Sequence, residues 1–190
     1  TRIMLELLPE DVSLPLVFSV LFHDIGKPPT FAVDETGRIR FNGHDRVGAE
    51  MTEAVMLRLR FSRAEIDATV EMVRQHMVFK DVPNMRTAKL KRFMARPTFV
   101  DELELHRVDC ASSHAMLDNY EFLLRKRDEF ANEPIIPPPL VRGDDLIAMG
   151  LKPGPHFGQI LEAIETRQLE GAFQSRDEAL EWVKREYANA

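Results

Sequence analysis

The sequence has few of the residues that mark secreted and membrane proteins. Cys110 is its single cysteine among 190 residues, so no internal disulfide can form, which fits a reducing compartment. The longest apolar run, residues 14–22, is interrupted by a proline and is too short to cross a bilayer. No basic-then-apolar leader opens the chain. We therefore expect no membrane partner and a cytoplasmic location.

An excess of positive charge is also missing. The chain has 25 lysines and arginines against 31 aspartates and glutamates, a net charge of -6, which argues against binding a polyanion over the whole surface. Hydrophobic residues make up 44% of the sequence and charged residues 29%, enough to bury a core. Apolar residues recur at helical spacing nearly throughout, which predicts an all-α fold.

The helical pattern is broken by turn and capping signals. Residues 31–42 read as a loop or a short hairpin. Ser62 and Glu65 form a capping box before a helix whose inward face ends at His76. We expect a helix that is capped by Asp11 or Ser13 and ends near Phe22, a short basic helix over 87–94, and a long helix from Phe99 to about Phe130. A further helix should start at His44, with a buried stripe of Val47, Met51, Val55 and Leu59.

A proline-rich stretch divides the chain. Residues 133–139 contain four prolines and cannot propagate a helix, so they read as a stiff linker. We expect a helical domain over 1–132, a linker over 133–143 and a small helical segment over 144–190. In that segment Ser175 and Glu178 form a second capping box, and Ala179, Trp182 and Val183 of the final helix point inward.

A pair of adjacent metal-binding residues, His23 and Asp24, stands at the end of the first apolar run. Removing both from water is costly unless a cation lies between them. Alone, each histidine would more often be a hydrogen-bonded core residue, but His44 and His76 also fall at a helix end or on an inward face. Together with Asp109, a carboxylate among apolar neighbours, they predict a site for one or two divalent ions: Mn, Fe, Ni, Co, Zn or Mg.

The chemistry expected of such a site is hydrolysis of a phosphate ester. A bound ion lowers the pKa of water and neutralises phosphoryl charge. Lys27, three residues after Asp24, is placed to bind phosphate, so Asp24 and Lys27 are the expected catalytic residues, although a solvated lysine is an equal alternative. Arg86, Lys89 and Arg92 form a local basic cluster that either binds RNA or phosphate or simply faces water.

Residues 21–29 resemble the signature of the HD superfamily of metal-dependent phosphohydrolases. The resemblance implies an HD-domain helical bundle in which His23, Asp24 and Asp109 hold metal, with His44 and His76 added as in two-metal subfamilies. His106 and His114 are weaker candidates for supporting the site. Residues 43–50, 105–114, 119–122, 143–150, 153–157 and 169–171 further resemble the part of bacterial CCA-adding tRNA nucleotidyltransferases and poly(A) polymerases that follows the polymerase head.

The resemblance also has limits. In that family a first metal-ligating histidine stands one residue before the position that Thr1 matches, so we expect this chain to begin just after it. No segment resembles the nucleotidyltransferase head. Exposed apolar surface near Thr1 would favour oligomers.

The function expected from the sequence is that of a phosphomonoesterase or 2',3'-cyclic phosphodiesterase in RNA 3'-end processing. Its partner would be a phosphorylated nucleotide or an RNA 3' end, for example that of tRNA. A non-catalytic RNA-positioning module of a nucleotidyltransferase and a stand-alone nucleotide phosphohydrolase are the alternatives.

Overall fold

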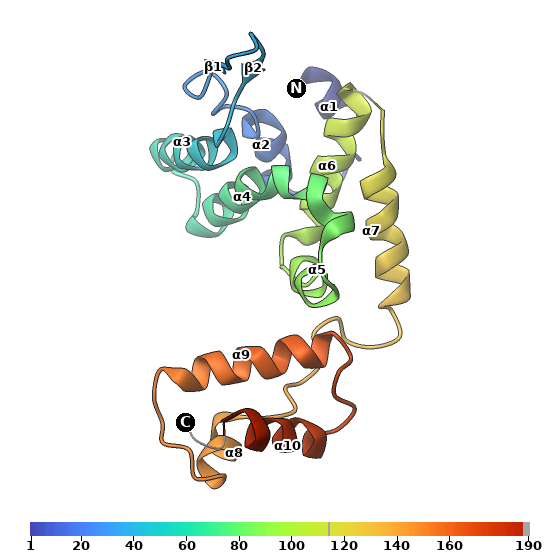
Figure 1. The fold of residues 1–190 in the computed structure, drawn as a ribbon. Coiled ribbons are helices and arrows are strands. Elements are labelled where there is room, and N and C mark those ends of the chain that lie inside the picture. Colours follow the sequence, from blue (N-terminus) through green and yellow to red (C-terminus); the bar gives the residue numbers. More distant parts are fainter. Residues whose placement is uncertain (114, 188–190) are drawn as a thin grey trace. The chain divides into compact units, whose positions relative to one another are not determined.

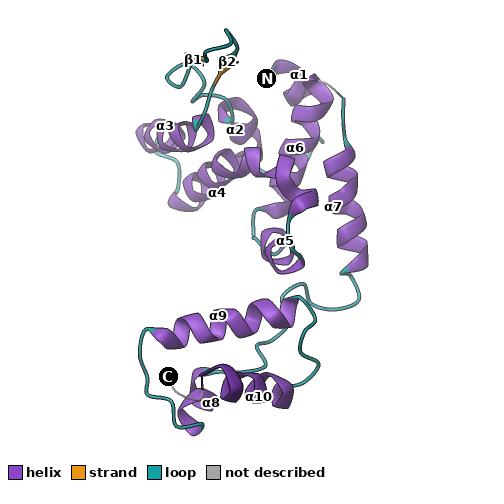
Figure 2. Cartoon of the chain, viewed as in Figure 1, coloured by secondary structure: helices purple, strands orange, loops and turns teal. Residues whose placement is uncertain are grey.

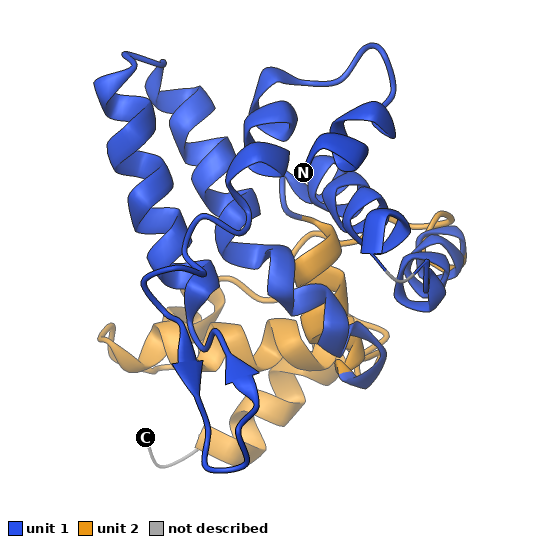
Figure 3. Ribbon diagram, turned by 90° about the horizontal axis from the view of Figure 1, so that it is seen from above, with its two compact units in different colours: residues 1–84, 96–128 blue, residues 85–95, 129–190 orange. Residues whose placement is uncertain are grey.

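The computed structural model describes residues 1–113 and 115–187, and this part of the chain is almost entirely helical (Figures 1 and 2). It contains ten α-helices, one 3₁₀ helix and a two-stranded hairpin, which confirms the all-α prediction. The chain forms two compact units, shown in Figure 3. Unit 1 comprises residues 1–84 and 96–128, and unit 2 comprises residues 85–95 and 129–190.

Unit 1 is built around helix α4, which packs against both α2 and α3. Ser13 caps α2 by accepting a hydrogen bond from the amide of Leu16, and the predicted capping box of Ser62 and Glu65 starts α4. One core cluster consists of Met4, Leu16, Val20, Met72, Leu105 and Val108. The elements of this unit are α1 (Arg2–Glu6), α2 (Leu14–Phe22), β1 (Ala32–Val33), β2 (Ile39–Arg40), α3 (His44–Arg58), α4 (Arg63–Gln75), η1 (His76–Asn84), α6 (Phe99–Ser113) and α7 (Asp118–Glu129).

The expected long helix from Phe99 to Phe130 is wrong, because α6 ends at Ser113 and α7 begins at Asp118. Ala115 adopts a left-handed backbone conformation, with φ of 57°, and its amide donates to the carbonyl of Cys110 at 2.8 Å. A right-handed helix cannot continue through such a residue. No glycine or proline marks the break, so the spacing of apolar residues predicts one continuous helix there.

The expected buried stripe of α3 is also wrong, by one position. Val47, Met51 and Val55 are only partly buried and Leu59 is exposed. The fully buried residues are His44, Gly48, Ala49, Thr52 and Met56. Most of these are small, so the helix packs close to its neighbours on a face that a search for large apolar side chains does not find.

Residues 31–42 include the expected short hairpin, in which Ala32 pairs with Arg40 and Val33 with Ile39. Asp34 fixes its turn: one carboxylate oxygen accepts from the amides of Thr36 and Arg38, both at 3.0 Å, and the other accepts from Arg40 Nε at 2.8 Å. The hydrogen bond from the Thr36 hydroxyl, then those from Arg40 and the Arg38 amide, lower the pKa of Asp34 to about 2.

Unit 2 has its own core. The buried residues Val141, Leu146, Ile160, Ile164, Ala179, Trp182 and Val183 cluster together, so the inward face expected of the last helix is confirmed. The helices of this unit are α5 (Thr87–Met94), α8 (Gly143–Ala148), α9 (His156–Leu169) and α10 (Arg176–Tyr187). Contacts group α5 with α9, whereas the sequence placed α5 in the first domain. The domain boundaries stay a prediction.

Within the described ranges, every helix is too short or too polar to traverse a bilayer.

Candidate metal centre

Three histidines of unit 1 are oriented in the same way, with Nδ1 toward the backbone and Nε2 toward other side chains of the site. His23 follows the end of α2, His76 follows the end of α4, and His44 is the first residue of α3. In each ring Nδ1 lies within hydrogen-bonding distance of the carbonyl three residues earlier: 3.0 Å to Val20, 2.8 Å to Phe41 and 2.6 Å to Val73. A carbonyl only accepts, so Nδ1 carries the hydrogen and the neutral ring keeps a lone pair on Nε2.

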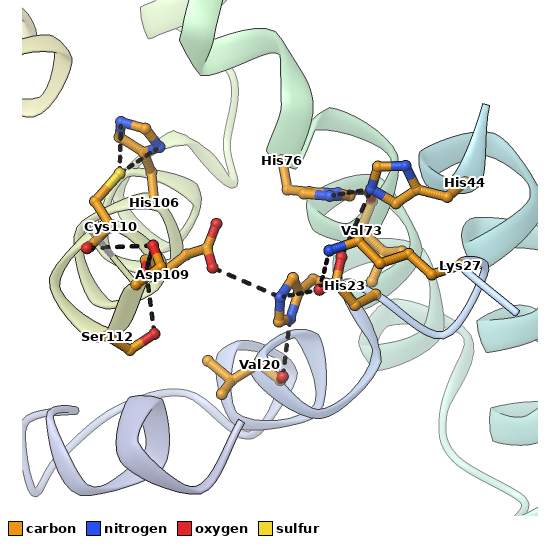
Figure 4. Close-up of polar contacts among 12 residues, drawn as sticks. Val20, His23, Lys27, His44, Val73, His76, His106, Asp109, Cys110 and Ser112 are labelled. Carbon is orange, nitrogen blue, oxygen red and sulfur yellow. Dashed lines mark hydrogen bonds and ion pairs between the residues drawn. The ribbon is translucent and has the colours of Figure 1, made fainter. Parts of the chain in front are cut away.

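The Nε2 atoms of His44 and His76 lie 3.1 Å apart (Figure 4). Since both rings carry their hydrogen on Nδ1, these are two acceptors facing one another, and a cation between them resolves the repulsion. Two imidazole nitrogens each about 2.1 Å from a metal, at a right angle, would be about 3 Å apart. The structure therefore fits a shared ion at this position.

Asp24 completes the closest group. Its Oδ1 lies 3.6 Å from His44 Nε2, and the ligand atoms of Asp24, His44 and His76 all lie within 4.8 Å of one another. One carboxylate and two imidazoles are a donor set that Mn, Fe, Co, Ni and Zn accept. These three residues can hold a divalent ion.

A close backbone contact holds Asp24 near His44. A Cβ atom on Gly26 would lie 2.1 Å from the His44 carbonyl oxygen and 2.6 Å from the Gly48 amide nitrogen. Only glycine allows the turn after α2 to approach the start of α3 this closely. The turn that carries Asp24 is thereby fixed against α3, which carries His44.

His23 and Asp109 lie beside this group rather than in it. The Nε2 atom of His23 is 3.3 Å from Asp24 Oδ2. It is 3.8 Å from Asp109 Oδ1, and Figure 4 shows these two side chains pointing toward one another. Burial lowers the pKa of His23, but hydrogen bonding and charge from Asp24, together with the charge of Asp109, outweigh it and raise the pKa above the ordinary value. A second ion would take these residues as ligands.

The two aspartates are more exposed than the sequence indicated. Their side chains are 37% exposed for Asp24 and 44% for Asp109, because both face the open cavity rather than apolar neighbours. Burial raises the pKa of Asp24, but hydrogen bonds with His23 and Lys27 outweigh it and hold the pKa well below its usual range. Asp24 is therefore an anion at neutral pH, as a metal ligand must be.

Lys27 lies at the same site. Its Nζ is 2.6 Å from Asp24 Oδ2 and 5.7 Å from the centre of the Phe41 ring. The lysine thus stands beside the proposed ligand as a positive charge. It is placed to meet an anion bound at the ion.

The cavity has a volume of about 410 Å³ and includes residues that the sequence analysis missed. Arg38 and Arg40 from the hairpin and Lys80 from η1 add positive charge, and Asp45 adds a carboxylate. Arg38 and Arg40, which alternate along the chain shortly before His44, are a signal in the sequence for positive charge near the site. The helical pattern of apolar residues, however, does not predict that a hairpin borders the cavity.

The remaining candidates lie elsewhere. Arg86, Lys89 and Arg92 belong to unit 2; the first two are exposed, while Arg92 donates to Glu165 at 2.6 Å. The ring of His106 stacks on Phe79 at 4.8 Å and lies 3.7 Å from the Cys110 sulfur, so it serves packing. His114 lies outside the described residues.

Comparisons with known proteins agree with this geometry. The HD domain model matches residues 2–130. An A-adding tRNA nucleotidyltransferase from Deinococcus radiodurans is 35% identical in an alignment of 186 positions that covers 92% of this chain and 42% of the relative. A CC-adding tRNA nucleotidyltransferase from Thermus thermophilus is 34% identical in an alignment of 179 positions that covers 93% of this chain and 41% of the relative.

The chain thus spans about two fifths of the length of these curated relatives. No solved structure matches it significantly. The matched family model covers the elements that carry all five expected ligands, His23, Asp24, His44, His76 and Asp109. The chain therefore belongs to the HD domain family and is related to tRNA nucleotidyltransferases.

Proposed function

We propose that this chain is a metal-dependent phosphohydrolase that removes a terminal phosphate, as a monoester or a 2',3'-cyclic ester, from an RNA 3' end. The observation that carries the proposal is the pair of Nε2 atoms of His44 and His76, 3.1 Å apart and next to the Asp24 carboxylate, in rings whose Nδ1 atoms already face a carbonyl. Two imidazoles that are each fixed through Nδ1 and point Nε2 at one another have the arrangement of ligands that share a metal ion.

The residues around the ligands support the same chemistry. A divalent ion in this site would supply a water of lowered pKa and would neutralise charge on the phosphate. Lys27 would bind a phosphate oxygen, since its ammonium group already accompanies the Asp24 carboxylate at 2.6 Å. The three carbonyls that accept from Nδ1 keep each imidazole in one orientation and one tautomer.

A second candidate function is an RNA-positioning part of a nucleotidyltransferase. It is favoured by the similarity to an A-adding and a CC-adding tRNA nucleotidyltransferase, which extends over 92–93% of this chain and so includes unit 2. In that case Arg86 and Lys89, both exposed at the start of α5, would contact the RNA backbone. The two functions are compatible in one protein.

The test is metal-dependent turnover. With Mn²⁺ or Ni²⁺ added, the chain should hydrolyse p-nitrophenyl phosphate and an RNA ending in a 2',3'-cyclic phosphate, and Asp24→Ala should abolish both activities and metal binding. Asp81→Ala is the control, because Asp81 is exposed and does not line the cavity.

Three other results would redirect the proposal. A chain that binds no metal and turns over no substrate would leave RNA positioning as its function. Hydrolysis of free mononucleotides in preference to RNA would point to a stand-alone nucleotide phosphohydrolase. Turnover that persists in Asp24→Ala would place the reaction elsewhere.

A further inference from the structure

The cavity of the metal centre has two positive charges that the site chemistry leaves unused. Lys27 is paired with Asp24, and Arg40 is paired with Asp34 at 2.8 Å. Arg38 and Lys80 also line the cavity and are exposed, and no ion pair among the described residues engages their side chains. Although Asp45 and Asp109 also line the cavity, neither forms an ion pair with these two side chains, so the two cations can attract a second anionic group of a bound ligand.

The hairpin places apolar surface next to this charge. Pairing of Val33 with Ile39 puts these two residues on one face, and the alternation of a strand adds Phe31 and Phe41 to it. Phe31, Val33 and Ile39 are 55%, 56% and 54% exposed. The rings of Phe31 and Phe41 are 6.0 Å apart, and both Ile39 and Phe41 line the cavity.

Such a surface is unusual for so small an element. A two-stranded hairpin gains little from folding alone, and exposed apolar patches beside a cavity mark binding sites. Asp34 nevertheless holds the turn through bonds to the amides of Thr36 and Arg38 and to Arg40 Nε. The hairpin is therefore locked in shape while its apolar face and the Arg38 guanidinium remain available.

Cations beside an apolar and aromatic surface match one ligand chemistry, that of single-stranded nucleic acid, in which phosphates alternate with bases. We infer that the β1–β2 hairpin, together with Lys80, binds the nucleotide adjoining the phosphate at the metal centre: Arg38 and Lys80 bind its phosphate, and Ile39 and Phe41 contact a base. The preferred substrate is then an RNA strand end rather than a simple phosphate monoester. This inference rests on the proposed function and names its substrate class.

The experiment compares two substrates in the same protein. One is p-nitrophenyl phosphate, which has a single phosphate and no nucleotide, and the other is a short single-stranded RNA with a 3'-phosphate. In Arg38→Ala/Lys80→Ala, the ratio of kcat/KM for RNA to kcat/KM for the small ester should fall by about tenfold or more for each cation removed. Arg38→Lys, which keeps the charge, should restore part of the ratio.

Binding gives a second readout that needs no turnover. Affinity for the same RNA with a 3'-hydroxyl, measured by fluorescence anisotropy, should depend on salt, and the slope of log affinity against log salt should drop by roughly 0.7 per phosphate contact removed. The control is Arg46→Ala/Arg58→Ala, which removes two exposed cations of α3 that do not line the cavity. It should change neither the ratio nor the slope.

The failures are separable. A protein that hydrolyses neither substrate contradicts the proposed function, and the salt slope alone then decides whether the hairpin binds RNA. If the double variant hydrolyses both substrates with the wild-type ratio of kcat/KM values and binds RNA with the wild-type salt slope, that result overturns the hairpin inference and leaves the proposed phosphohydrolase function in place. Equal loss on both substrates, with an unchanged slope, overturns it as well.

Discussion

The metal cavity of unit 1 and the basic helix α5 of unit 2 carry similar positive charge but differ in what that charge contacts. In α5, Arg92 donates to Glu165 at 2.6 Å and to the Thr166 hydroxyl at 2.9 Å, so it fastens α5 to α9. In the cavity, Arg38 and Lys80 take part in no ion pair among the residues described. Local density of basic residues therefore does not by itself predict which of them are available to bind phosphate. The ion-pair partners of each residue distinguish Arg92, which holds two helices together, from Arg38 and Lys80.

The histidines show the same contrast within unit 1. His44 and His76 are anchored through Nδ1 to a carbonyl and present Nε2 to one another, while His106 stacks on Phe79. The direction of the second ring nitrogen distinguishes these roles, because a metal needs an accessible lone pair.

The largest effect should follow from removing a ligand. His44→Gln should reduce the affinity for Mn²⁺ or Zn²⁺ by about a hundredfold or more, because it leaves His76 and Asp24 to hold the ion alone. Calorimetric titration measures the change. His106→Gln is the matched control and should keep wild-type affinity; an equal loss in both variants would erase the contrast between the histidines.

A smaller loss of metal affinity should result from separating the turn after α2 from the start of α3, the two backbone segments that hold the site. In Gly26→Ala the new Cβ would lie 2.1 Å from the His44 carbonyl oxygen, so Asp24 and His44 must move apart, which should cost about 1–3 kcal/mol of stability and weaken metal binding. Gly158→Ala in α9 meets nothing within 4 Å and should be neutral or stabilising. Urea denaturation with and without metal would measure both; unchanged stability in Gly26→Ala would contradict the close approach.

Metal affinity should rise with pH, since an imidazole binds metal only when neutral. Burial, with the charges of His23 and His44, lowers the pKa of His76, so this ligand protonates only below the ordinary histidine value of about 6.5. His23 has a raised pKa, so it becomes neutral only above the ordinary value. Its contribution to metal affinity should therefore appear at a higher pH than that of His76. Each titrating histidine should change the affinity by up to about tenfold per pH unit. His23→Gln should remove the higher transition, and an affinity constant from pH 5.5 to 8 would contradict the assignment.

The smallest effect should come from α5. The Arg92 and Glu165 side chains are 35% and 39% exposed, so Arg92→Met should destabilise unit 2 by at most about 1 kcal/mol, seen as a small shift of the thermal unfolding midpoint. RNA affinity should change less than in Arg38→Ala/Lys80→Ala. A larger loss of RNA binding in Arg92→Met would reverse the comparison between the helix and the cavity.

Local signals in the sequence predict the structure correctly where it depends on neighbours along the chain. The capping box at Ser62, the short helix Thr87–Met94 and the inward face of α10 follow from side chains within a few residues of one another. The break between α6 and α7 was missed because it depends on the backbone of Ala115, which carries no glycine or proline signal. The buried face of α3 was misread because small residues, not large apolar ones, make its contacts.

Periodicity, caps and residue chemistry are local properties, so the amino-acid sequence alone predicts a helical protein with histidines and aspartates at the ends and inner faces of successive helices. Which of these residues meet depends on how the helices pack. Asp24, His44 and His76 come together because Gly26 lets two backbones touch, and the cavity gains Arg38 because a hairpin between two helices borders it. Distances between groups far apart in the chain are set by packing, which no single segment encodes.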